Sequence, residues 1–425
     1  MSQPPNFKER SGNGMPRRLG IVTSHLPFGS SEAFLYPELK GLSELGYELT
    51  IFPAAPRSNR RVHNDFKVDF VRFPLFAPRT FLRAFGVFSR NIRVASQALR
   101  TILKSKNRLR TKLKNIVLFP VGLAVGGEAR ARGITHLHAY WLSGPATVGL
   151  VASQVAGLSW SYSAHSWDIF MEENLICEKM KSASFGRVIS EQGHAALRLR
   201  SQTFQSGPLR VIHLGVMIVN QVPPEKNTSP IGRIDLLCPA YLLPVKGHAY
   251  LIEALRGVID AGVDCRCLFA GEGPLRTSLA RKIRDLGLAE VVSMPGMIPH
   301  DQFLKQLRSG TYDAVVLASV QLGTEFEGIP VSLMEAMSAG IPCIATRTGA
   351  IDELINSECG ILVEQRDPVA LRDAIVRLAV DPLGRKAMGL AARRRVAAEF
   401  DATESARSLA ALISDAEGST GRPAG

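Results

Sequence analysis

Two glutamates separated by seven residues are the strongest candidates for chemistry in this sequence. Glu327 and Glu335 lie within the segment EFEGIPVSLMEAMSAGIPCIAT. Pro330 suits the first turn of a helix, where its missing N–H would be unpaired in any case, and Gly340 suits the position just after a helix. The sequence therefore predicts a helix over about residues 330–339, with Glu327 in the loop before it and Glu335 inside it.

The start of this helix has the properties of an anion-binding site. Its first-turn N–H groups lack partners within the helix, and the helix dipole places positive charge there. Glu335 is the only charged residue of the predicted helix, and its neighbours are mostly apolar. Such a carboxylate needs hydrogen-bond donors, and the adjacent hydroxyls of a ribose supply two. The pattern predicts a bound nucleotide whose diphosphate contacts the loop and first turn, namely Gly328, Ile329, Pro330, Val331, Ser332 and Leu333.

A second interpretation of the same segment needs no ligand. Glu335 would then face solvent, and Glu327 would only stabilise its own loop. The proline, the glycine and both carboxylates agree with one another, and this agreement favours the ligand-binding interpretation.

The elements that must position these residues are parallel strands. Short β-branched runs alternate with helical patterns along the chain, as in parallel sheets covered by helices on both faces. With 425 residues, the chain exceeds what one hydrophobic core usually supports. The α/β fold predicted is two Rossmann-like, doubly wound domains that face each other across a cleft, where ligands bind beyond the strand ends. Strands are expected at 19–24, 49–54, 136–141, 160–165, 186–190 and 210–215, and at 235–240, 265–271, 291–296, 314–319, 342–346 and 360–364.

The segment with the two glutamates resembles the retaining family 4 glycosyltransferases, which have the GT-B fold. That family has two glutamates with this separation in a similar Gly-x-Pro context, and MEAMSAGIP at 334–342 is similar to its donor-site helix. The resemblance is strongest to bacterial members of the colanic-acid and exopolysaccharide type, and it covers most of residues 18–400. The other matching segments are SSEAFLYPELKGLSELGYELTIF at 30–52, SAHSWDIF at 163–170 and HLGV at 213–216.

The resemblance implies catalytic roles for Glu327, Lys246 and His165. Glu327 would contact the donor sugar, whereas Glu335 would hold the nucleotide ribose. Lys246, just before a helix that starts near Gly247, would neutralise the departing diphosphate, on which negative charge grows as the glycosidic bond breaks. His165 matches a histidine that approaches the donor sugar. A lone histidine is more often structural, and only its place at the predicted cleft favours this role.

Further donor contacts are implied near the strand ends. Gly29 and Ser30, between a strand and a helix, would let the backbone approach the donor phosphate or the acceptor. Gly271 and Gly273, in the string GEGP after another expected strand, are assigned to donor binding. Asp168, one short turn after the candidate histidine, is a further candidate.

The sequence departs from the family pattern at two positions. Family members commonly place an arginine five residues before the Lys246 position, to share the diphosphate charge. Tyr241 stands there instead, and a phenol cannot replace a guanidinium. Arg276 or Arg347 would have to supply the second cation, or transfer would be weak. Met217 stands where an aspartate often follows His-x-Gly-Val.

Positive charge is concentrated in one segment. Residues 57–114 contain sixteen Lys and Arg against two acids, a net charge of +14, while the whole chain carries +13. Between Phe81 and Leu113 basic and apolar residues alternate in a helix-compatible way, as in helices that lie on membrane surfaces. We expect this segment to dock on an anionic membrane. The alternative is a solvated basic face over an ordinary core stripe.

Changes of composition along the chain indicate its division into domains. The first sixteen residues are polar and lack the apolar core of a secretory signal, and MIVNQVPPEKNTSPIGR is typical of a linker. The expected parts are a disordered tail at 1–16, an N-terminal Rossmann-like acceptor domain at 17–220, a linker at 221–232, a C-terminal Rossmann-like nucleotide-sugar domain at 233–397, a helix at 398–415 that packs back on the N-terminal domain, and a disordered tail at 416–425.

The predicted function is a hexosyltransferase reaction. The donor would be a nucleoside diphosphate sugar, and the acceptor a glycan or polyprenyl-linked sugar of exopolysaccharide or cell-surface polysaccharide synthesis, with retention at the anomeric carbon. Neither a metal nor another cofactor is expected, because the second domain lacks an Asp-x-Asp pair and Lys246 with helix amides can meet the charge. The longest apolar runs are about half of a membrane span, so the enzyme is expected in the cytoplasm, at the inner face of the plasma membrane.

Two other functions are alternatives. A sugar-nucleotide epimerase or a phosphorylase could use the same fold, and product analysis would separate them because neither needs a sugar acceptor. A nucleic-acid or anion-binding protein could use the basic segment, but that segment shows neither the aromatic pattern of an RNP motif nor a compact recognition fold. Nucleic acid is therefore not an expected partner.

Overall fold

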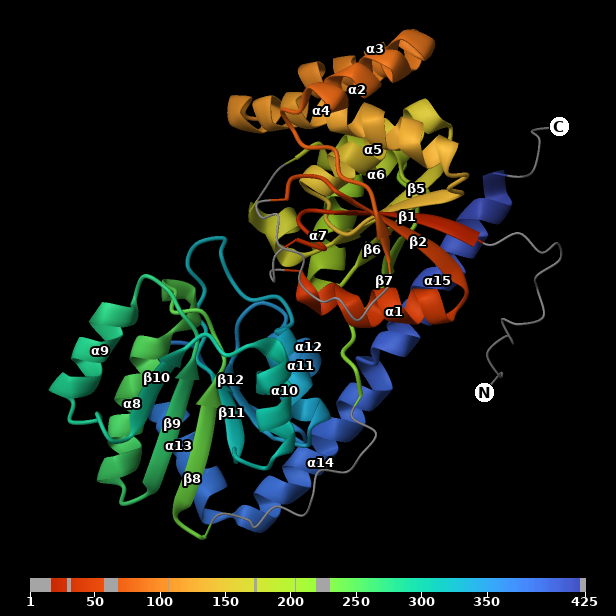
Figure 1. Cartoon of the computed structure of the whole chain (residues 1–425). Helices are drawn as coiled ribbons and strands as arrows, with labels where there is room; N and C mark the ends of the chain where they lie inside the picture. The colour runs from red at the N-terminus through yellow and green to blue at the C-terminus, as the bar shows by residue number, and fades with distance from the viewer. Residues whose placement is uncertain are drawn as a thin grey trace. The chain divides into compact units, whose positions relative to one another are not determined.

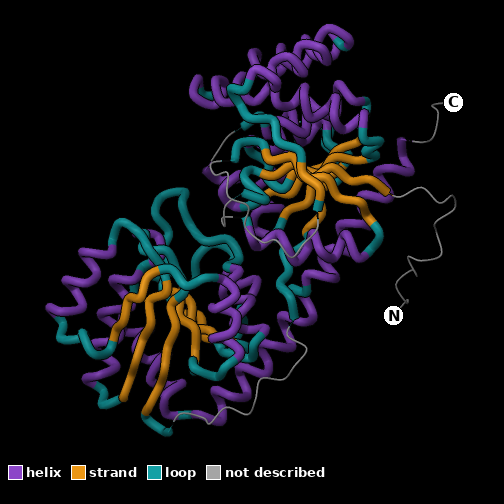
Figure 2. The backbone as a smooth tube through the Cα atoms, in the orientation of Figure 1, coloured by secondary structure: helices purple, strands orange, loops and turns teal. Residues whose placement is uncertain are grey.

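The computed structural model describes residues 17–28, 32–56, 68–105, 107–171, 174–202, 204–218 and 230–420. The chain divides into two compact units. Unit 1 comprises the residues up to His213 together with those from Thr403 onward, and unit 2 runs from Leu214 to Ala402. Each unit contains one parallel β-sheet flanked by helices (Figures 1 and 2).

The sheet of unit 1 has seven strands, β1 Arg17–Thr23, β2 Tyr47–Pro53, β3 Asp69–Phe70, β4 His136–Ala139, β5 Ser159–Ala164, β6 Phe185–Val188 and β7 Leu209–Val211. They lie in the order β3-β2-β1-β4-β5-β6-β7, and every pair is parallel. In β1, Leu19, Ile21 and Val22 are fully buried, as expected for a strand covered on both faces. The strand order reverses between β1 and β4, so ligands of this sheet are expected at the carboxyl ends of these two strands.

Strands β4 and β5 bury polar side chains that bond to one another. The ring of His136 contacts the hydroxyls of Ser159 and Ser161 at 2.8 and 2.7 Å. The ring of His138 contacts Ser161 and Ser163 at 2.7 and 2.9 Å. Burial lowers the pKa of His136 to about 3, and the pKa of His138 is lowered for the same reason. Both rings are therefore neutral parts of the sheet, with every ring nitrogen satisfied.

The helices of unit 1 are α1 Tyr36–Glu44, α2 Pro78–Arg90, α3 Ile92–Lys104, α4 Leu109–Ala131, α5 Gly144–Ala156, α6 Ile176–Ser182, α7 Glu191–Ser201 and α15 Ala402–Thr420. Helices α2, α3 and α4 form a layer outside α5, away from the sheet (Figure 1). Their inner faces share a small core that includes Ala84, Ala95, Phe119 and Val151. This layer contains most of the described part of the basic segment, and residues 57–67 and 106 of that segment lie outside the described residues.

Helix α15 is joined to the rest of unit 1 by hydrogen bonds to a buried ion pair. Glu38 on α1 and Arg187 on β6 lie 2.6 Å apart, and both side chains are fully buried. Arg187 also donates to Ser405 of α15 at 3.0 Å, and the Ser405 hydroxyl donates to Glu38. The sequence placed the end of this helix near residue 415, but the helix continues to Thr420. Glu417 accepts a hydrogen bond from Thr135, and this contact holds the additional turn on the sheet.

The sheet of unit 2 has six strands, β8 Arg233–Cys238, β9 Asp264–Ala270, β10 Val292–Gly296, β11 Ala314–Leu317, β12 Cys343–Thr346 and β13 Gly360–Val363. They are parallel and lie in the order β10-β9-β8-β11-β12-β13. The strand order reverses between β8 and β11, which makes the carboxyl ends of these two central strands the expected binding edge. The helices are α8 His248–Asp260, α9 Arg276–Asp285, α10 His300–Arg308, α11 Val331–Ser338, α12 Ile351–Leu354, α13 Pro368–Val380 and α14 Pro382–Glu399.

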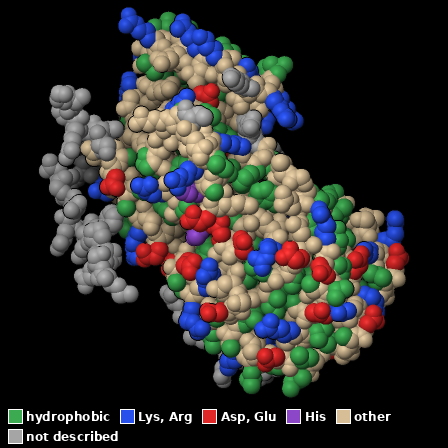
Figure 3. All heavy atoms as spheres, turned by 180° about the vertical axis from the view of Figure 1, so that it is seen from behind, with side chains coloured by type: hydrophobic (Ala, Val, Ile, Leu, Met, Phe, Trp, Pro, Cys, Tyr) green, Lys and Arg blue, Asp and Glu red, His purple; other side chains and the backbone are tan. Residues whose placement is uncertain are grey.

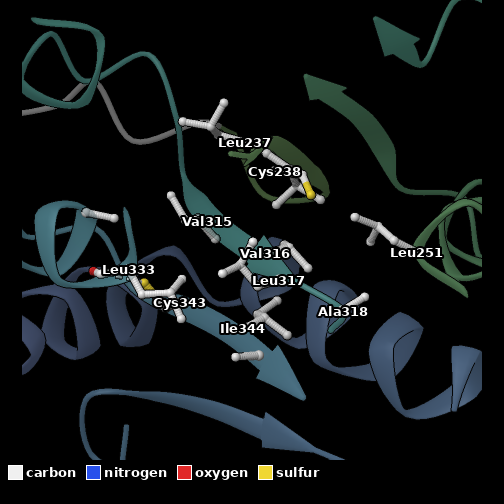
Figure 4. Packing of buried hydrophobic residues seen from close by; sticks show 14 of the residues in the cluster. Leu237, Cys238, Leu251, Val315, Val316, Leu317, Ala318, Leu333, Cys343 and Ile344 are labelled. Atoms are coloured by element: carbon white, nitrogen blue, oxygen red, sulfur yellow. Dashed lines mark hydrogen bonds between the residues drawn. The ribbon is translucent and has the colours of Figure 1, made fainter. Parts of the chain in front are cut away.

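The core of unit 2 surrounds its central strands. Figure 4 shows Val315, Val316 and Leu317 of β11 between Leu237 of β8 and Ile344 of β12. All five side chains are at most 1% exposed. This packing fixes where β8 and β11 end, and so fixes the loops that follow them.

All twelve strands predicted from the sequence are present, within a few residues of the expected bounds. The sequence missed only β3, a two-residue strand at the edge of the first sheet. Most of the predicted linker, residues 221–229, lies outside the described residues. None of the helices that the structure describes has both the length and the apolar character that a membrane crossing requires.

Candidate active site

Lys246 and Glu327 form an ion pair at the carboxyl ends of the two central strands of unit 2. Lys246 ends the short turn Pro244–Lys246 after β8, and Glu327 lies in the loop after β11. The same carboxylate oxygen of Glu327 accepts a hydrogen bond from Ser319 at 2.8 Å. The structure thus joins two predicted site residues and adds Ser319, which the sequence did not indicate.

Two glycines allow the surrounding loops to approach this pair. Gly247 has φ +64°, and a Cβ placed there would lie 1.8 Å from the carbonyl oxygen of Ala318. Gly349 has φ +57°, and a Cβ there would lie 1.7 Å from the carbonyl oxygen of Glu327. Both positions therefore exclude any side chain, on steric grounds as well as by backbone conformation. The loops after β8 and β12 are held against the loop after β11.

Helix α11 begins directly after the Glu327 loop. It runs from Val331 to Ser338, as the sequence predicted, with Pro330 at its N-cap. Pro330 makes no side-chain cap, so the positive end of the helix is left for another partner. The predicted diphosphate contacts follow Glu327 directly in the chain. They are the loop residues Gly328 and Ile329 and the first-turn residues Val331, Ser332 and Leu333.

Glu335 has a partner that the sequence did not reveal. Its carboxylate lies 2.5 Å from Nε2 of His300, the first residue of α10. The Glu335 side chain is 11% exposed and the His300 side chain 43% exposed. The hydrogen bond that His300 donates to Glu335 raises the pKa of His300, with a smaller contribution from Asp301. Helix α10 follows β10, which is separated from β11 in the sheet by β9 and β8. The two residues are therefore brought together by the fold, and no local sequence pattern links them.

The other candidate residues of unit 2 lie in the loops after β8 and β9. A Cβ at Gly271 would lie 1.9 Å from the carbonyl oxygen of Ala240, so the loop after β9 packs on the loop that carries Tyr241. Tyr241 itself is 53% exposed. Gly273 packs in the same way on the carbonyl oxygen of Leu242, where a Cβ would lie at 2.5 Å.

The two arginines suggested as a second cation bond to other groups in the described structure. Arg276 donates to Glu272 at 2.9 Å and to the carbonyl of Met294 at 2.8 Å. Arg347 donates to Glu364 at 3.2 Å. Lys246 is therefore the cation that the structure places on Glu327.

His165 and Asp168 lie at the binding edge of unit 1. Asp168 is buried and accepts N–H groups of Leu142, Ser143 and His165 at 3.1, 3.1 and 3.2 Å. Burial raises the pKa of Asp168 to about 6 and lowers that of His165 to about 3. The ring of His165 stacks on Trp141, with centroids 4.3 Å apart. Among the described residues, no partner is found for its buried Nε2 atom.

Glu32 is a residue of unit 1 that the sequence reasoning missed. Its side chain accepts the backbone N–H groups of Ser24, His25 and Leu26 at 3.0, 2.6 and 2.7 Å, and also the indole N–H of Trp141. Glu32 thereby ties the loop after β1 to the loop after β4. Its only signal was its place in the segment SSEAFLYP, which the family resemblance includes.

A cavity of about 910 Å³ opens beside these residues, and we call it the unit 1 cavity. Its lining includes His25, Glu32, Arg110, Lys114, Trp141 and Trp167. The predicted contacts Gly29 and Ser30 lie outside the described residues. Within the described parts of the chain, no three His, Cys, Asp or Glu side chains are grouped as the ligands of a metal would be.

Comparison with known proteins identifies the second unit. Residues 221–395 match the family model of glycosyl transferases group 1. A GDP-mannose-dependent monoacylated alpha-(1-6)-phosphatidylinositol monomannoside mannosyltransferase of Corynebacterium glutamicum is 30% identical over 174 residues, 41% of this chain and 44% of the relative. The colanic acid biosynthesis glycosyltransferase WcaL of Escherichia coli is 32% identical over 221 residues, 51% of this chain and 53% of the relative. The chain thus spans about half the length of the curated relatives it matches.

Solved structures share the architecture over nearly the whole chain. HepE of Anabaena, in complex with UDP and glucose, has a TM-score of 0.70 at 17% identity, covering 94% of this chain and 100% of that one. This likeness concerns the fold, with its two parallel sheets and flanking helices. Residues 221–395 are therefore similar to the group 1 glycosyl transferases, and the chain shares the GT-B fold of the solved structures.

Proposed function

We propose that the protein is a retaining hexosyltransferase. It would move a sugar from a nucleoside diphosphate sugar to a lipid-linked or oligosaccharide acceptor during bacterial exopolysaccharide or cell-surface polysaccharide synthesis. The observation that carries this proposal is the Lys246–Glu327 pair at the switch point of the second sheet, directly before the uncapped start of α11. The similarity to WcaL, named for colanic acid biosynthesis, supports the choice of pathway type.

Each group at this edge has a task in such a reaction. Lys246 neutralises the diphosphate that leaves, and the first-turn amides of α11 add partial positive charge at the same place. Glu327 accepts hydroxyls of the donor sugar. Glu335, less than two turns into α11, takes the ribose hydroxyls in place of His300. His165 of unit 1, which burial keeps neutral, offers a hydrogen bond to the transferred sugar.

We propose that transfer needs neither a metal ion nor another cofactor. The second unit contains no Asp-x-Asp pair, and Lys246 with the helix amides supplies charge where a divalent cation would otherwise act. Transfer should therefore continue at full rate in excess EDTA. A rate restored only by added Mg²⁺ or Mn²⁺ would contradict this part of the proposal.

We further propose that helices α2–α4 hold the enzyme at the inner, anionic face of the plasma membrane. Eleven large apolar side chains between Phe76 and Val117 are exposed, and the sequence has no Asp or Glu between Phe70 and Gly127. In Figure 3, Lys and Arg side chains lie beside hydrophobic ones at the top of the view, where these helices are drawn. Exposed apolar side chains beside clustered cations favour adsorption to anionic lipid.

Vesicle sedimentation tests the membrane assignment. The protein should sediment with phosphatidylglycerol vesicles at low salt and much less with phosphatidylcholine vesicles. Leu82→Ser with Phe85→Ser, both on α2 and more than 70% exposed, should weaken this binding. Leu383→Ser, 80% exposed on α14 of unit 2, is the matched control. Equal loss in both variants would contradict a docking role for α2.

A panel of sugar nucleotides tests the catalytic assignment. UDP-, GDP-, ADP- and TDP-linked sugars are added singly, and the melting temperature of the full chain is measured. A ligand that binds the folded state raises the melting temperature, so the sugars of one nucleotide class should raise it selectively. The matching donor is then incubated with a glycan acceptor. Formation of a longer glycan supports transfer, whereas epimerised or phosphorolysed sugar without an acceptor product would overturn it.

A further inference from the structure

The unit 1 cavity has one wall that combines cations with apolar side chains. Arg110, Leu113, Lys114 and Val117 all line it from helix α4. Their spacing of three and four residues puts them on one face of the helix. Leu113 and Val117 remain 54% and 39% exposed, so the apolar strip extends from the cavity to the surface. This wall suits a ligand with both a charged and an apolar part.

The start of helix α5 forms another part of the lining, and buried side chains hold it in place. Ser143, Gly144 and Pro145 line the cavity there, and Ser143 makes no side-chain cap. The turn before the helix is held from both sides. Asp168 accepts its N–H groups, and buried Lys179 donates to the carbonyls of Leu142 and Ser143 at 2.7 and 2.6 Å. The start of α5 therefore borders the cavity in a rigid position, with the Asp168 carboxylate bound to the N–H groups before it.

Two cationic side chains, Arg110 and Lys114, belong to the described lining of the cavity. Glu32 is the one acidic side chain in the described lining, and its oxygens already accept four N–H groups. A phosphate group bound in the cavity would meet these two cations, and charge-assisted hydrogen bonds to such groups are strong.

We propose that the unit 1 cavity binds a lipid phosphate or diphosphate. The phosphoryl group lies between Arg110, Lys114 and the start of α5, and the lipid chain follows Leu113, Val117 and the half-exposed ring of Trp167 toward the surface. This inference rests on the proposed function, because such a molecule would be the carrier of the acceptor sugar. It adds the place on this chain where the carrier is recognised.

Binding of farnesyl diphosphate to the full chain tests the inference. Trp141 and Trp167 line the cavity and are two of the three tryptophans, so intrinsic fluorescence reports on occupancy. Farnesyl diphosphate should bind saturably below its micelle concentration. Farnesol, which lacks the charge, and inorganic pyrophosphate, which lacks the chain, should each bind at least about 10-fold more weakly.

Two double variants separate the cavity from general surface charge. Arg110→Gln with Lys114→Gln should weaken farnesyl diphosphate binding by about 10-fold or more. Arg93→Gln with Arg100→Gln removes the same charge from exposed positions on α3, outside the lining, and should change binding by less than about 2-fold. Equal weakening in both double variants would overturn the proposal. Melting temperatures of the wild type and both double variants establish that the variants fold.

Three further results would distinguish the possible failures. Dihexanoyl phosphatidylglycerol that binds as tightly as farnesyl diphosphate would overturn the assignment to a lipid phosphate carrier and point to ordinary headgroups. A protein whose melting temperature rises with a nucleotide sugar but which does not bind farnesyl diphosphate would sink this inference alone. A protein that binds farnesyl diphosphate in the cavity but no nucleotide sugar would sink the proposed function and leave the cavity ligand standing.

Discussion

Lys246 and Glu327 lie 81 positions apart in the sequence and share an ion pair in the second unit. The contact exists because β8 and β11 are neighbours in the sheet, so the loops that follow them meet at one edge. Only 21% of the Lys246 side chain and 11% of the Glu327 side chain are exposed. A partly buried pair of this kind holds both side chains in position before a ligand arrives.

Replacing Lys246 tests the leaving-group role. Lys246→Ala should lower kcat by about 100-fold or more, because negative charge on the departing diphosphate would lose its fixed cation. The rate is measured with saturating donor and acceptor. Lys282→Ala is the matched control, since Lys282 pairs with Glu253 on the surface of the same unit and should keep full activity. A fully active Lys246→Ala enzyme would refute the role.

Replacing Glu327 tests the donor-sugar role. Glu327→Gln keeps an acceptor for the Ser319 hydroxyl but removes the negative charge, so the fold should persist while transfer falls by about 100-fold or more. Circular dichroism and the melting temperature check the fold. Glu253→Gln, which removes a carboxylate from the surface pair, should leave transfer unchanged. Retained transfer by Glu327→Gln would assign Glu327 to loop stability alone.

The sheets were predictable because their strands are marked by local sequence. Apolar runs between turn residues fixed all twelve longer strands and their alternation with helices. Strand β3 gave no such pattern, since it is two residues long and pairs only with β2 at the edge. Likewise, the end of α15 at Thr420 depends partly on a contact between Glu417 and Thr135, which sequence periodicity does not reveal.

The site was predictable where its residues lie close together in the chain. The spacing of Glu327, Pro330 and Glu335 indicated a loop and a helix, and α11 has the expected bounds. The partners of these carboxylates come from other strands and were missed. Ser319 and His300 reach them only through the order of the sheet, and no residue type or spacing in the sequence marks either one.

The buried pair of Glu38 and Arg187 should be essential to the stability of unit 1. Arg187→Ala leaves a fully buried carboxylate without its cation, which typically costs about 3–5 kcal/mol of unfolding free energy. Urea denaturation measures the loss. Glu44→Ala on the same helix breaks an exposed pair with Lys40 and should cost less than about 1 kcal/mol. Similar small losses in both variants would contradict a structural role for the buried pair.

The contact between His300 and Glu335 predicts a pH dependence of stability. The hydrogen bond to Glu335 holds the pKa of His300 in the folded protein above its ordinary value of 6.5. A raised pKa means that protonation favours the folded state, so the stabilisation is complete below pH 6.5 and is lost as the pH rises through the raised value. His300→Gln should remove this pH-dependent contribution, as judged by melting temperatures between about pH 5 and pH 9.

The same contact should make nucleotide binding depend on pH. Protonated His300 competes with the ribose hydroxyls for Glu335, and the competition weakens when the imidazole loses its proton. The Kd of the selected sugar nucleotide should therefore fall as the pH rises, by up to about 10-fold, in the wild type. His300→Gln cannot titrate and should show little pH dependence over the same range. His194→Gln on α7, which removes a surface histidine near Glu191, is the control and should behave as the wild type. An unchanged pH profile in His300→Gln would show that His300 does not control access to Glu335.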